Sequence, residues 1–489
     1  MLQFSIYVVV ALCATIVMSA HASPLDSLEG KWLGTQEYAP DKYAPDAPQL
    51  GLEFKRTKGG NFSVSLYQTV MSLYNVDLPS GVQYSNGVFT LQDMGISFTL
   101  ANGVLKGASK SGTTTFSLRR TNLLPTEPPI PNVPNFPNDR WQTKLGSAIY
   151  ATAAIYDTLA YVGTSGGVFN AVSVKSGDVV WTFSAGRPIH GEALTTNDAV
   201  LFVCDNGFLF KLSRTTGKEL WRYNLGDAQV SRILPHPFVY DYDVKAPKPV
   251  LIDSLLYIGS GDGSIHAVNI ANGQRVWRHE TQGKVRSEAL ASGSQIIVGT
   301  WENMLYALDC ITGKEIWKKD MKGVINSAPA LVDGKLILGT RGAVLYAIKP
   351  ENGDILWRAP YWGSWVESSA VSRDGLLYIG SSDLRRVVCY NPSNGKNLWR
   401  TDVYGWTWNR PVLTEKYVFV GVGGTNPYFT RHIGSLTALD RKTGAIVWRT
   451  PAPEPSGYFQ TGFVAAPAIS GKTLVIGGLD GTLSAFEVE

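Results

Sequence analysis

A glycine four residues before a tryptophan recurs along most of the chain, and this repeat constrains the fold more than any other feature of the sequence. Successive tryptophans, starting from Trp141, are 40 to 56 residues apart, and Ser, Thr or Asn precedes each glycine. Self-similarity at a period near 40, in segments made of strands, is typical of propellers and related β arrays. The repeated pairs are Gly177 and Trp181, Gly217 and Trp221, Gly273 and Trp277, Gly313 and Trp317, Gly353 and Trp357, Gly395 and Trp399, and Gly444 and Trp448.

One period, residues 327–357, predicts how each unit folds. Four apolar segments, 328–332, 335–340, 344–349 and 354–357, are separated by the turn signals "DG", "RG" and "ENG". The glycine of the last turn supplies the positive φ that a tight hairpin demands. We expect the tryptophan to end the outermost strand and to bury its ring against the next blade, which is a structural role and not a catalytic one.

The two ends of the repeat region predict how the ring closes. Trp141 has no matching glycine, but "WQTKLG" resembles the residues that follow the other tryptophans, and the chain ends in "TLSAFEVE", a third strand without a fourth. The strand at Trp141 is therefore expected to complete the last blade. This gives an all-β, eight-bladed propeller without an exposed sheet edge.

The region before the ring divides into three parts. Residues 1–22 are expected to be a signal peptide cleaved after Ala22, because an apolar run at 6–18 is followed by "AHA". No Lys or Arg precedes that run, so an uncleaved anchor is the alternative. We expect a secreted or periplasmic protein. Residues 23–124 alternate apolar and polar positions and predict a small β-barrel or sandwich, weakly similar to lipocalin-like modules that begin with Gly-x-Trp. Residues 125–140 form a Pro-rich linker, and residues 141–489 form the propeller.

Charge and cysteine content exclude several classes of protein. The 44 basic and 40 acidic residues give a net charge of +4 and are scattered along the chain, so no nucleic-acid partner is expected. The mature chain has no predicted membrane span, and we expect a monomer. The three cysteines after the signal, Cys204, Cys310 and Cys389, are widely spaced and predict buried free thiols and not a disulfide framework. Asn61 begins an N-glycosylation sequon, which matters only in a eukaryotic secretory host.

The segments "LYALDCITGKEIW" (305–317) and "SLTALDRKTGAIVW" (435–448) resemble the pyrroloquinoline-quinone-like repeat. The resemblance implies the propeller fold. The family includes quinoprotein dehydrogenases, which bind the quinone (PQQ) and calcium in the central funnel. It also includes a scaffold protein of outer-membrane β-barrel assembly (BamB) and many binding domains. Adjacent cysteines and Cys-x-x-Cys-His, which mark dehydrogenase subtypes, are missing from this sequence, and so is the lipobox of the scaffold.

The longest insertions indicate which face of the propeller binds a ligand or partner. Residues 227–248 and 451–463 join the outer strand of one blade to the inner strand of the next, and residues 423–434 join two middle strands. Both kinds of loop lie on the same face of a propeller. Because function concentrates in loops that a rigid scaffold presents, we expect this face to bind.

The beginnings of the inner strands predict which residues line the funnel mouth. Aligning each blade on "INSAPA" brings carboxylates, an imidazole, arginines and a tryptophan to one axis, where charges should shift each other's pKa values. A ring of solvated polar residues is the alternative. The aligned residues are Tyr150, Thr152, His190, Glu192, Arg286, Ser287, Glu288, Asn326, Glu367, Ser368, Trp408, Asn409, Arg410, Val464 and Ala465, with Arg232 in the ambiguous third blade.

Two chemistries suit these residues. In the dehydrogenase hypothesis, which the resemblance implies, Glu192, Glu288, Glu367 and Asn326 are candidate calcium ligands. The quinone would then contact Arg286, Arg232, Asn326, Asn409 and the ring of Trp408. In the second hypothesis, a lyase or hydrolase of a polar or sugar substrate, His190 does acid–base work with Glu192, Glu288, Glu367 and Arg410. Rim aromatics could stack on sugars, cap a partner or simply pack: Tyr240, Tyr242, Trp362, Trp365, Trp406, Tyr428 and Tyr458.

The sequence contains no complete catalytic signature, and this decides which function we expect first. No closed zinc spacing, P-loop, Gly-x-Ser-x-Gly or dinucleotide fingerprint is present. A secreted binding or scaffold protein, with a protein partner or a small polar ligand on the top face and no certain cofactor, is the leading hypothesis. The PQQ- and calcium-dependent dehydrogenase of alcohols or sugars comes second, and the lyase or hydrolase third.

Overall fold

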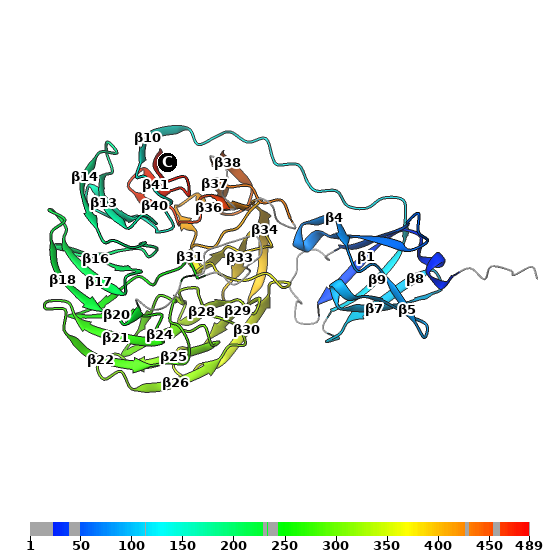
Figure 1. Cartoon of the computed structure of the whole chain (residues 1–489), viewed down its shortest axis with the longest axis horizontal. Coiled ribbons are helices and arrows are strands. Elements are labelled where there is room, and N and C mark those ends of the chain that lie inside the picture. Colours follow the sequence, from blue (N-terminus) through cyan, green and yellow to red (C-terminus); the bar gives the residue numbers. More distant parts are fainter. Residues whose placement is uncertain are drawn as a thin grey trace, which may run out of the picture.

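The computed structural model describes residues 23–38, 49–112, 114–227, 232, 243–425, 430–452 and 460–488. Within these ranges the chain is all-β, apart from short 3₁₀ segments. The predicted signal peptide lies outside the described residues. Figure 1 shows a ring of sheets with a smaller domain at its side and an extended linker between them.

The small domain is one antiparallel sheet of nine strands, in the order β4-β3-β2-β1-β9-β8-β7-β6-β5. The sheet curls around its own apolar core, in which Trp32 and Phe54 are 1% exposed. The predicted barrel or sandwich is thus a curled half-barrel (Figure 1). Its elements are η1 (Pro24–Leu28), β1 (Gly30–Tyr38), β2 (Gln49–Arg56), β3 (Phe62–Gln68), η2 (Thr69–Met71), β4 (Leu73–Leu78), β5 (Gln83–Ser85), β6 (Val88–Leu91), η3 (Gln92–Met94), β7 (Ile96–Ala101), β8 (Val104–Ser109) and β9 (Thr114–Thr121).

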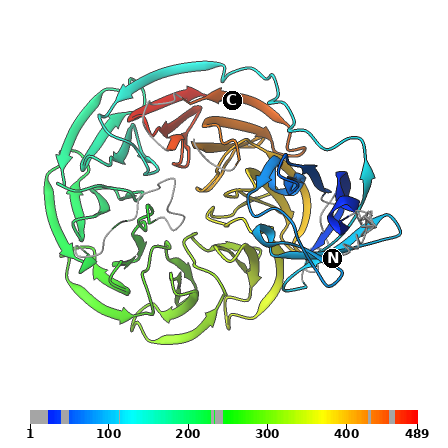
Figure 2. The same cartoon turned by 45° about the vertical axis from the view of Figure 1, so that its right-hand side comes forward.

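The ring consists of eight sheets arranged radially, as Figure 2 shows, and each blade has four antiparallel strands from the funnel to the rim. Blades one to four follow in chain order and repeat the predicted hairpins. They are β11 (Ala154–Tyr156), β12 (Leu159–Gly163), β13 (Val168–Ser173) and β14 (Val179–Ser184); β15 (Leu194–Thr195), β16 (Ala199–Cys204), β17 (Phe208–Ser213) and β18 (Glu219–Asn224); β19 (Val250–Ile252), β20 (Leu255–Gly259), β21 (Ser264–Asn269) and β22 (Arg275–Glu280); and β23 (Leu290–Ser292), β24 (Gln295–Gly299), β25 (Met304–Asp309) and β26 (Glu315–Asp320).

Blades five to eight repeat the arrangement, with one extra strand in blade seven that pairs with β36. They are β27 (Ala330–Val332), β28 (Lys335–Thr340), β29 (Val344–Ile348) and β30 (Ile355–Pro360); β31 (Val371–Arg373), β32 (Leu376–Ile379), β33 (Arg386–Asn391) and β34 (Lys396–Asp402); β35 (Val412–Leu413), β36 (Tyr417–Thr425), β37 (Ser435–Asp440) and β38 (Ile446–Pro451), with β39 (Gln460–Gly462); and β40 (Ala468–Ser470), β41 (Thr473–Gly477) and β42 (Thr482–Glu487) with β10 (Asn138–Lys144).

The last blade confirms the predicted closure. Strand β10 pairs antiparallel with β42, and Trp141 lies opposite Ala485. The first strand of the ring therefore supplies the rim strand that the end of the chain lacks. Strand β10 begins at Asn138, slightly earlier than the predicted start of the propeller at residue 141.

The repeated tryptophans and glycines form a belt of contacts between neighbouring blades. The indole of Trp277 donates to the carbonyl of Cys310 at 3.0 Å, and a Cβ on Gly313 would lie 2.6 Å from its ring. Gly313 has a φ of +70°, so the same glycine makes the turn and leaves room for the ring. Seven successive pairs repeat this contact, from Trp141 with Gly177 to Trp399 with Gly444.

Two details of the belt differ from the prediction. The tryptophan does not end the rim strand, because β30 continues from Trp357 to Pro360. Trp448 has no following hairpin glycine, since the rim strand of blade eight comes from the start of the ring. Phe136 of the linker covers it at a centroid distance of 5.8 Å.

The small domain docks on the rim of blade six. Val70 of η2 is 2% exposed and packs in one cluster with Leu384 and Tyr390. Arg386 donates to the carbonyl of Thr69 at 3.0 Å. This hydrogen bond joins the two domains beside the apolar contact of Val70. Figure 2 shows the small domain at one side of the ring.

The three cysteines of the domains are free, as predicted. Cys204 and Cys389 are buried in strands, and Cys310 is only half-buried. Burial raises the pKa of Cys204 to about 11, with lesser contributions from its neighbours, so this thiol is inert at neutral pH.

Candidate functional site

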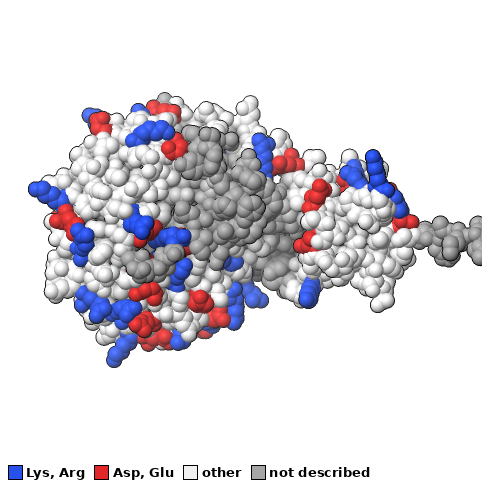
Figure 3. Space-filling view, in the orientation of Figure 1, with Lys and Arg blue, Asp and Glu red and all other residues white. Residues whose placement is uncertain are grey.

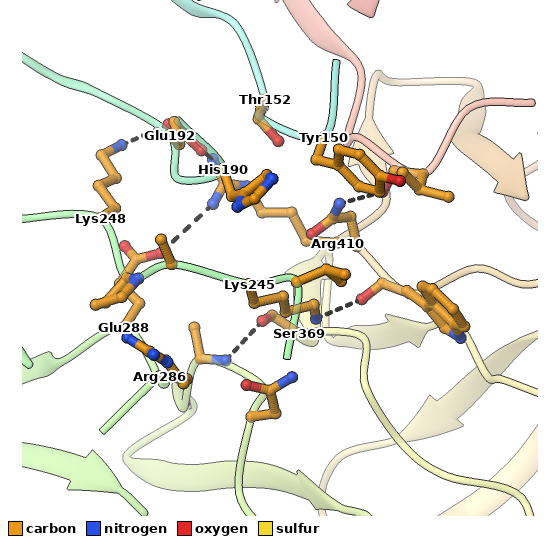
Figure 4. A pocket seen from close by; sticks show the side chains of 18 residues that line it. Tyr150, Thr152, His190, Glu192, Lys245, Lys248, Arg286, Glu288, Ser369 and Arg410 are labelled. Carbon is orange, nitrogen blue, oxygen red and sulfur yellow. Dashed lines mark hydrogen bonds and ion pairs between the residues drawn. The ribbon is translucent and has the colours of Figure 1, made fainter. Parts of the chain in front are cut away.

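The connections between blades converge on one cavity at the funnel mouth. Each connection leaves a rim strand, crosses the top of the blade and enters the next inner strand, so its polar residues reach the axis. Figure 4 shows the cavity, which encloses about 80 Å³. Of the predicted residues, the cavity is lined by Tyr150, Thr152, His190, Glu192, Arg286, Glu288, Asn326, Trp408, Asn409, Arg410 and Val464.

The sequence did not identify the segment that fills the middle of the funnel. Residues 243–248, the end of the long connection between blades two and three, reach across the axis, and residues 244–248 line the same cavity as the predicted residues. We call residues 243–248 the plug. Its charged side chains contact four other connections between blades. This one insertion therefore links the blades to one another at the centre of the funnel.

Asp243 of the plug is the most enclosed charge of the funnel. Its side chain is 0% exposed and lies 3.0 Å from Arg232 and from Arg286 and 3.2 Å from Lys284. Burial alone would raise the pKa of Asp243, but these three cations lower it by more, so the carboxylate is ionised. Arg286 is also held by Asp227 at 2.7 Å. Two predicted ligand residues, Arg232 and Arg286, are therefore engaged by the plug.

Lys245 of the plug and Glu367 form the second ionic group. The Lys245 ammonium lies 3.6 Å from Glu367 Oε2, and Asn326 Nδ2 donates to the same oxygen at 2.7 Å. The Arg341 guanidinium pairs with the other oxygen and lies over the rings of Trp301 and Trp365. Burial would raise the pKa of Glu367, but Arg341 and Lys245 lower it by more. Every polar atom of the Glu367 carboxylate therefore has a partner.

Glu192, Glu288 and Arg410 form the third group, nearest the opening. Lys248 of the plug donates to Glu192 at 2.6 Å, and Arg410 donates to its other oxygen at 2.5 Å. Glu288 has only a loose ion pair with Arg410, at 3.9 Å. Burial raises the pKa of Glu288 despite the opposing effect of Arg410 and Lys248. The Glu288 carboxyl therefore keeps its proton to a higher pH than an exposed glutamate does.

His190 lies at the wall of the cavity and not at its centre. Its Nδ1 is 3.0 Å from Asp205 Oδ2, without the alignment of a hydrogen bond, and Tyr150 meets the imidazole edge-on at 5.3 Å. Arg232 shares Asp205 with His190. Burial would raise the pKa of Asp205, but His190 and Arg232 lower it by more. Asp205 comes from a loop between middle strands, so the alignment of inner strands could not identify it.

Several other predicted residues pack and form hydrogen bonds within the wall of the cavity. Trp408 stacks on Trp406 at 4.6 Å and donates to Ser382, and both rings are buried. Asn409 donates to the carbonyl of Val464 and joins two connections. Ser287 and Ser368 are buried and donate to carbonyls of the following connections. Of the predicted rim aromatics, Tyr240, Tyr242, Tyr428 and Tyr458 lie outside the described residues.

The residues of the funnel do not fit calcium and the quinone. Calcium takes several uncommitted oxygen ligands, whereas the carboxylates of Glu192 and Glu367 pair with cations of the chain. In the part of the chain that the structure describes, no three His, Cys, Asp or Glu side chains gather as metal ligands.

Lys, Arg, Asp and Glu side chains are interspersed on the part of the surface that Figure 3 colours. In the described part of the chain, none of the helices has the length and apolarity of a membrane span.

Comparison with known proteins places this geometry in a family. A family model described as outer membrane protein assembly factor BamB matches residues 138–246, 261–363 and 341–489. Outer membrane protein assembly factor BamB of Yersinia pestis is 23% identical over 145 residues, which cover 29% of this chain and 36% of that protein. The 1-butanol dehydrogenase (quinone) of Thauera butanivorans is 30% identical over 118 residues, 24% of this chain and 19% of that protein. The matches thus span about a third or less of these relatives.

Solved structures agree on the fold. The crystal structure of BamB from Moraxella catarrhalis has a TM-score of 0.56 at 16% identity and covers 72% of this chain and 99% of its own. Quinohemoprotein alcohol dehydrogenase from Comamonas testosteroni has a TM-score of 0.55 at 14% identity and covers 72% and 76%. The sequence matches and the fold agree, and the family model covers more than half of the 489 residues, so the chain belongs to the family described as outer membrane protein assembly factor BamB, whose repeats are pyrroloquinoline-quinone-like.

Proposed function

We propose that this chain is a binding or scaffold protein of the periplasm or cell exterior, which presents the top face of its propeller to a partner protein. The observation that carries the proposal is the plug. Lys245 and its neighbours fill the funnel, and the carboxylates that could serve a cofactor pair with cations of the chain itself. Because most charged groups of the funnel pair with one another, we infer that the rim of the top face is the binding surface.

The names of the relatives suggest the class of partner. Both the family model and the Yersinia pestis relative are described as assembly factors of outer membrane proteins. We therefore propose a partner that takes part in building outer membrane proteins. A propeller suits this task because it holds many loops rigidly on one face.

A pull-down with the full chain from the envelope of its own host tests the proposal. Arg187 lies exposed in a top-face connection, and Lys175 lies exposed in a hairpin on the opposite face. Arg187→Glu should reduce recovery of the co-purifying polypeptide, and the matched variant Lys175→Glu should not. Equal recovery with both variants would contradict a top-face partner.

The enzymatic alternatives give distinct outcomes. The 30% identical relatives named as quinone-dependent dehydrogenases favour a redox enzyme. Adding quinone and calcium should then change the absorbance of the quinone and allow dye reduction by alcohols, whereas our proposal expects neither. The pairing of His190 with Asp205 favours an acid–base enzyme. Turnover of any polar substrate that His190→Ala abolishes in a folded protein would replace the scaffold proposal.

A further inference from the structure

The ammonium group of Lys245 is enclosed by oxygen atoms from two inter-blade connections. Nζ donates to the carbonyl oxygen of Glu367 at 2.5 Å and to that of Trp408 at 2.8 Å, and Glu367 Oε2 lies 3.6 Å away. Lys245 occupies the centre of the view in Figure 4. Two carbonyls and a carboxylate are a ligand set that small cations take in proteins.

The scaffold, and not the plug, holds these oxygen atoms in place. Ser368 follows Glu367 and donates to the carbonyl of Asn409, which follows Trp408, at 2.9 Å. The amide of Gly380 in turn donates to the Ser368 hydroxyl at 3.1 Å. The two connections are therefore tied together beside the ammonium. Arg341 and Asn326 fix the Glu367 side chain from the other side.

The carbonyl groups need a cationic or hydrogen-bonding partner whether or not the lysine is present. Glu367 is 4% and Trp408 5% exposed, and buried carbonyl oxygens without a partner are costly. Removal of the ammonium would take one neighbouring cation away from the Glu367 carboxylate. It would also leave the carbonyl groups of Glu367 and Trp408 without this hydrogen-bond donor. The fixed arrangement would then favour any small donor-bearing cation that could enter.

We propose that the Glu367 and Trp408 oxygens form a cation site of the propeller, which the chain fills with its own Lys245 ammonium. The ligand class is a primary alkylammonium ion, because the observed occupant is one. In the native protein the tethered ammonium keeps diffusible cations out of the funnel. This inference concerns the funnel itself and does not depend on the partner suggested above.

The test restores the missing group from solution. Lys245→Ala in the full chain removes three methylenes and the ammonium, which together correspond to propylammonium. We expect the thermal unfolding midpoint of this variant to fall by several degrees and to rise again, saturably, with propylammonium chloride. Tetramethylammonium chloride has the same charge but no N–H donor, so it should produce no saturable rise.

Two variants separate the site from general effects of salt and packing. Lys245→Met fills the space without a charge, and Lys248→Ala removes a plug lysine whose partner Glu192 retains Arg410. Neither should respond to propylammonium. An equal response of all variants, or no response of Lys245→Ala, would overturn the proposal. Failure of Lys245→Ala to fold even when it is refolded with the amine would also overturn it, because the added cation should fill the site.

Discussion

The rim and the funnel of the propeller join the same blades by different interactions. At the rim, seven of the eight indoles pack on the glycine of the next blade and donate one hydrogen bond to its turn, as Trp277 does to Gly313 and Cys310. In the funnel, the contacts are ion pairs such as Arg286 with Asp243, and the partners come from unrelated connections. The same apolar contact therefore recurs around the rim, whereas each ion pair of the funnel joins a different pair of residues and has no counterpart in the other blades.

The difference shows where the fold tolerates change. A repeated contact distributes the stabilisation of the ring over seven similar joints, so the loss of one joint leaves the others in place. The ions of the funnel are desolvated, and the removal of one partner leaves another charge buried without compensation. We therefore expect single substitutions to cost more in the funnel than at the rim.

The strongest test of this comparison is Asp243→Asn. The amide has the shape of the carboxylate but no charge, so Arg232, Lys284 and Arg286 would lose their common partner. We expect a loss of about 4 kcal/mol in the free energy of unfolding, as for other broken buried ion pairs. Denaturant unfolding followed by tryptophan fluorescence measures it.

A surface pair serves as the control for Asp243→Asn. Glu219 pairs with Arg222 on a rim strand, and the Arg222 side chain is 51% exposed. Glu219→Gln should cost less than about 1 kcal/mol, because exposed ion pairs contribute little. Equal losses in the two variants would mean that the plug does not brace the funnel.

The next largest effect concerns the rim. Gly313→Ala would place a Cβ 2.6 Å from Trp277 at a φ of +70°, whereas Gly293→Ala has a φ of +59° and nothing within 4 Å of the Cβ. We expect a cost of about 3 kcal/mol for Gly313→Ala and about 1 kcal/mol for Gly293→Ala, since only the first combines backbone strain with a clash. Thermal unfolding of both variants gives the comparison. Similar costs would show that the glycine serves the turn alone.

The division between repeated contacts at the rim and unique contacts in the funnel also explains what the sequence could predict. The spacing of Gly313 and Trp317 repeats, and a period can be read without knowing the fold, so the number of blades and the closure by β10 were predicted and are confirmed. The alignment on inner strands also found residues that share the cavity, such as Glu192 and Arg410.

The plug could not be predicted in this way because nothing in its sequence repeats. Lys245 and Asp243 lie in an insertion, and the aromatic residues Tyr240 and Tyr242 that precede them in the sequence are typical of stacking contacts. Asp205 comes from a loop class that the alignment did not include. In each case the contact joins residues that are far apart in the sequence, so no local pattern predicts it. The ion pairs that form in this way decide which residues remain available for a ligand.

The smallest predicted effect is a dependence on pH that the rim contacts lack. Burial lowers the pKa of His432 from 6.5 to about 3, opposed weakly by its bond to Thr430, and the imidazole lies 4.9 Å from Trp406 beside the funnel. A base whose pKa is lowered on folding binds protons more readily in the unfolded state. Stability is therefore retained above pH 6.5 and lost as the pH falls toward 3.

At pH 5 the loss attributable to His432 should be about 2 kcal/mol, from 1.5 pKa units at about 1.4 kcal/mol each. His432→Gln carries no proton-binding group in this range, so the difference in unfolding free energy between pH 7 and pH 5 should shrink by about that amount. The matched control is His279→Gln on the rim strand β22, where the difference should remain. A pH dependence that survives unchanged in His432→Gln would show that His432 is not the source of the acid sensitivity.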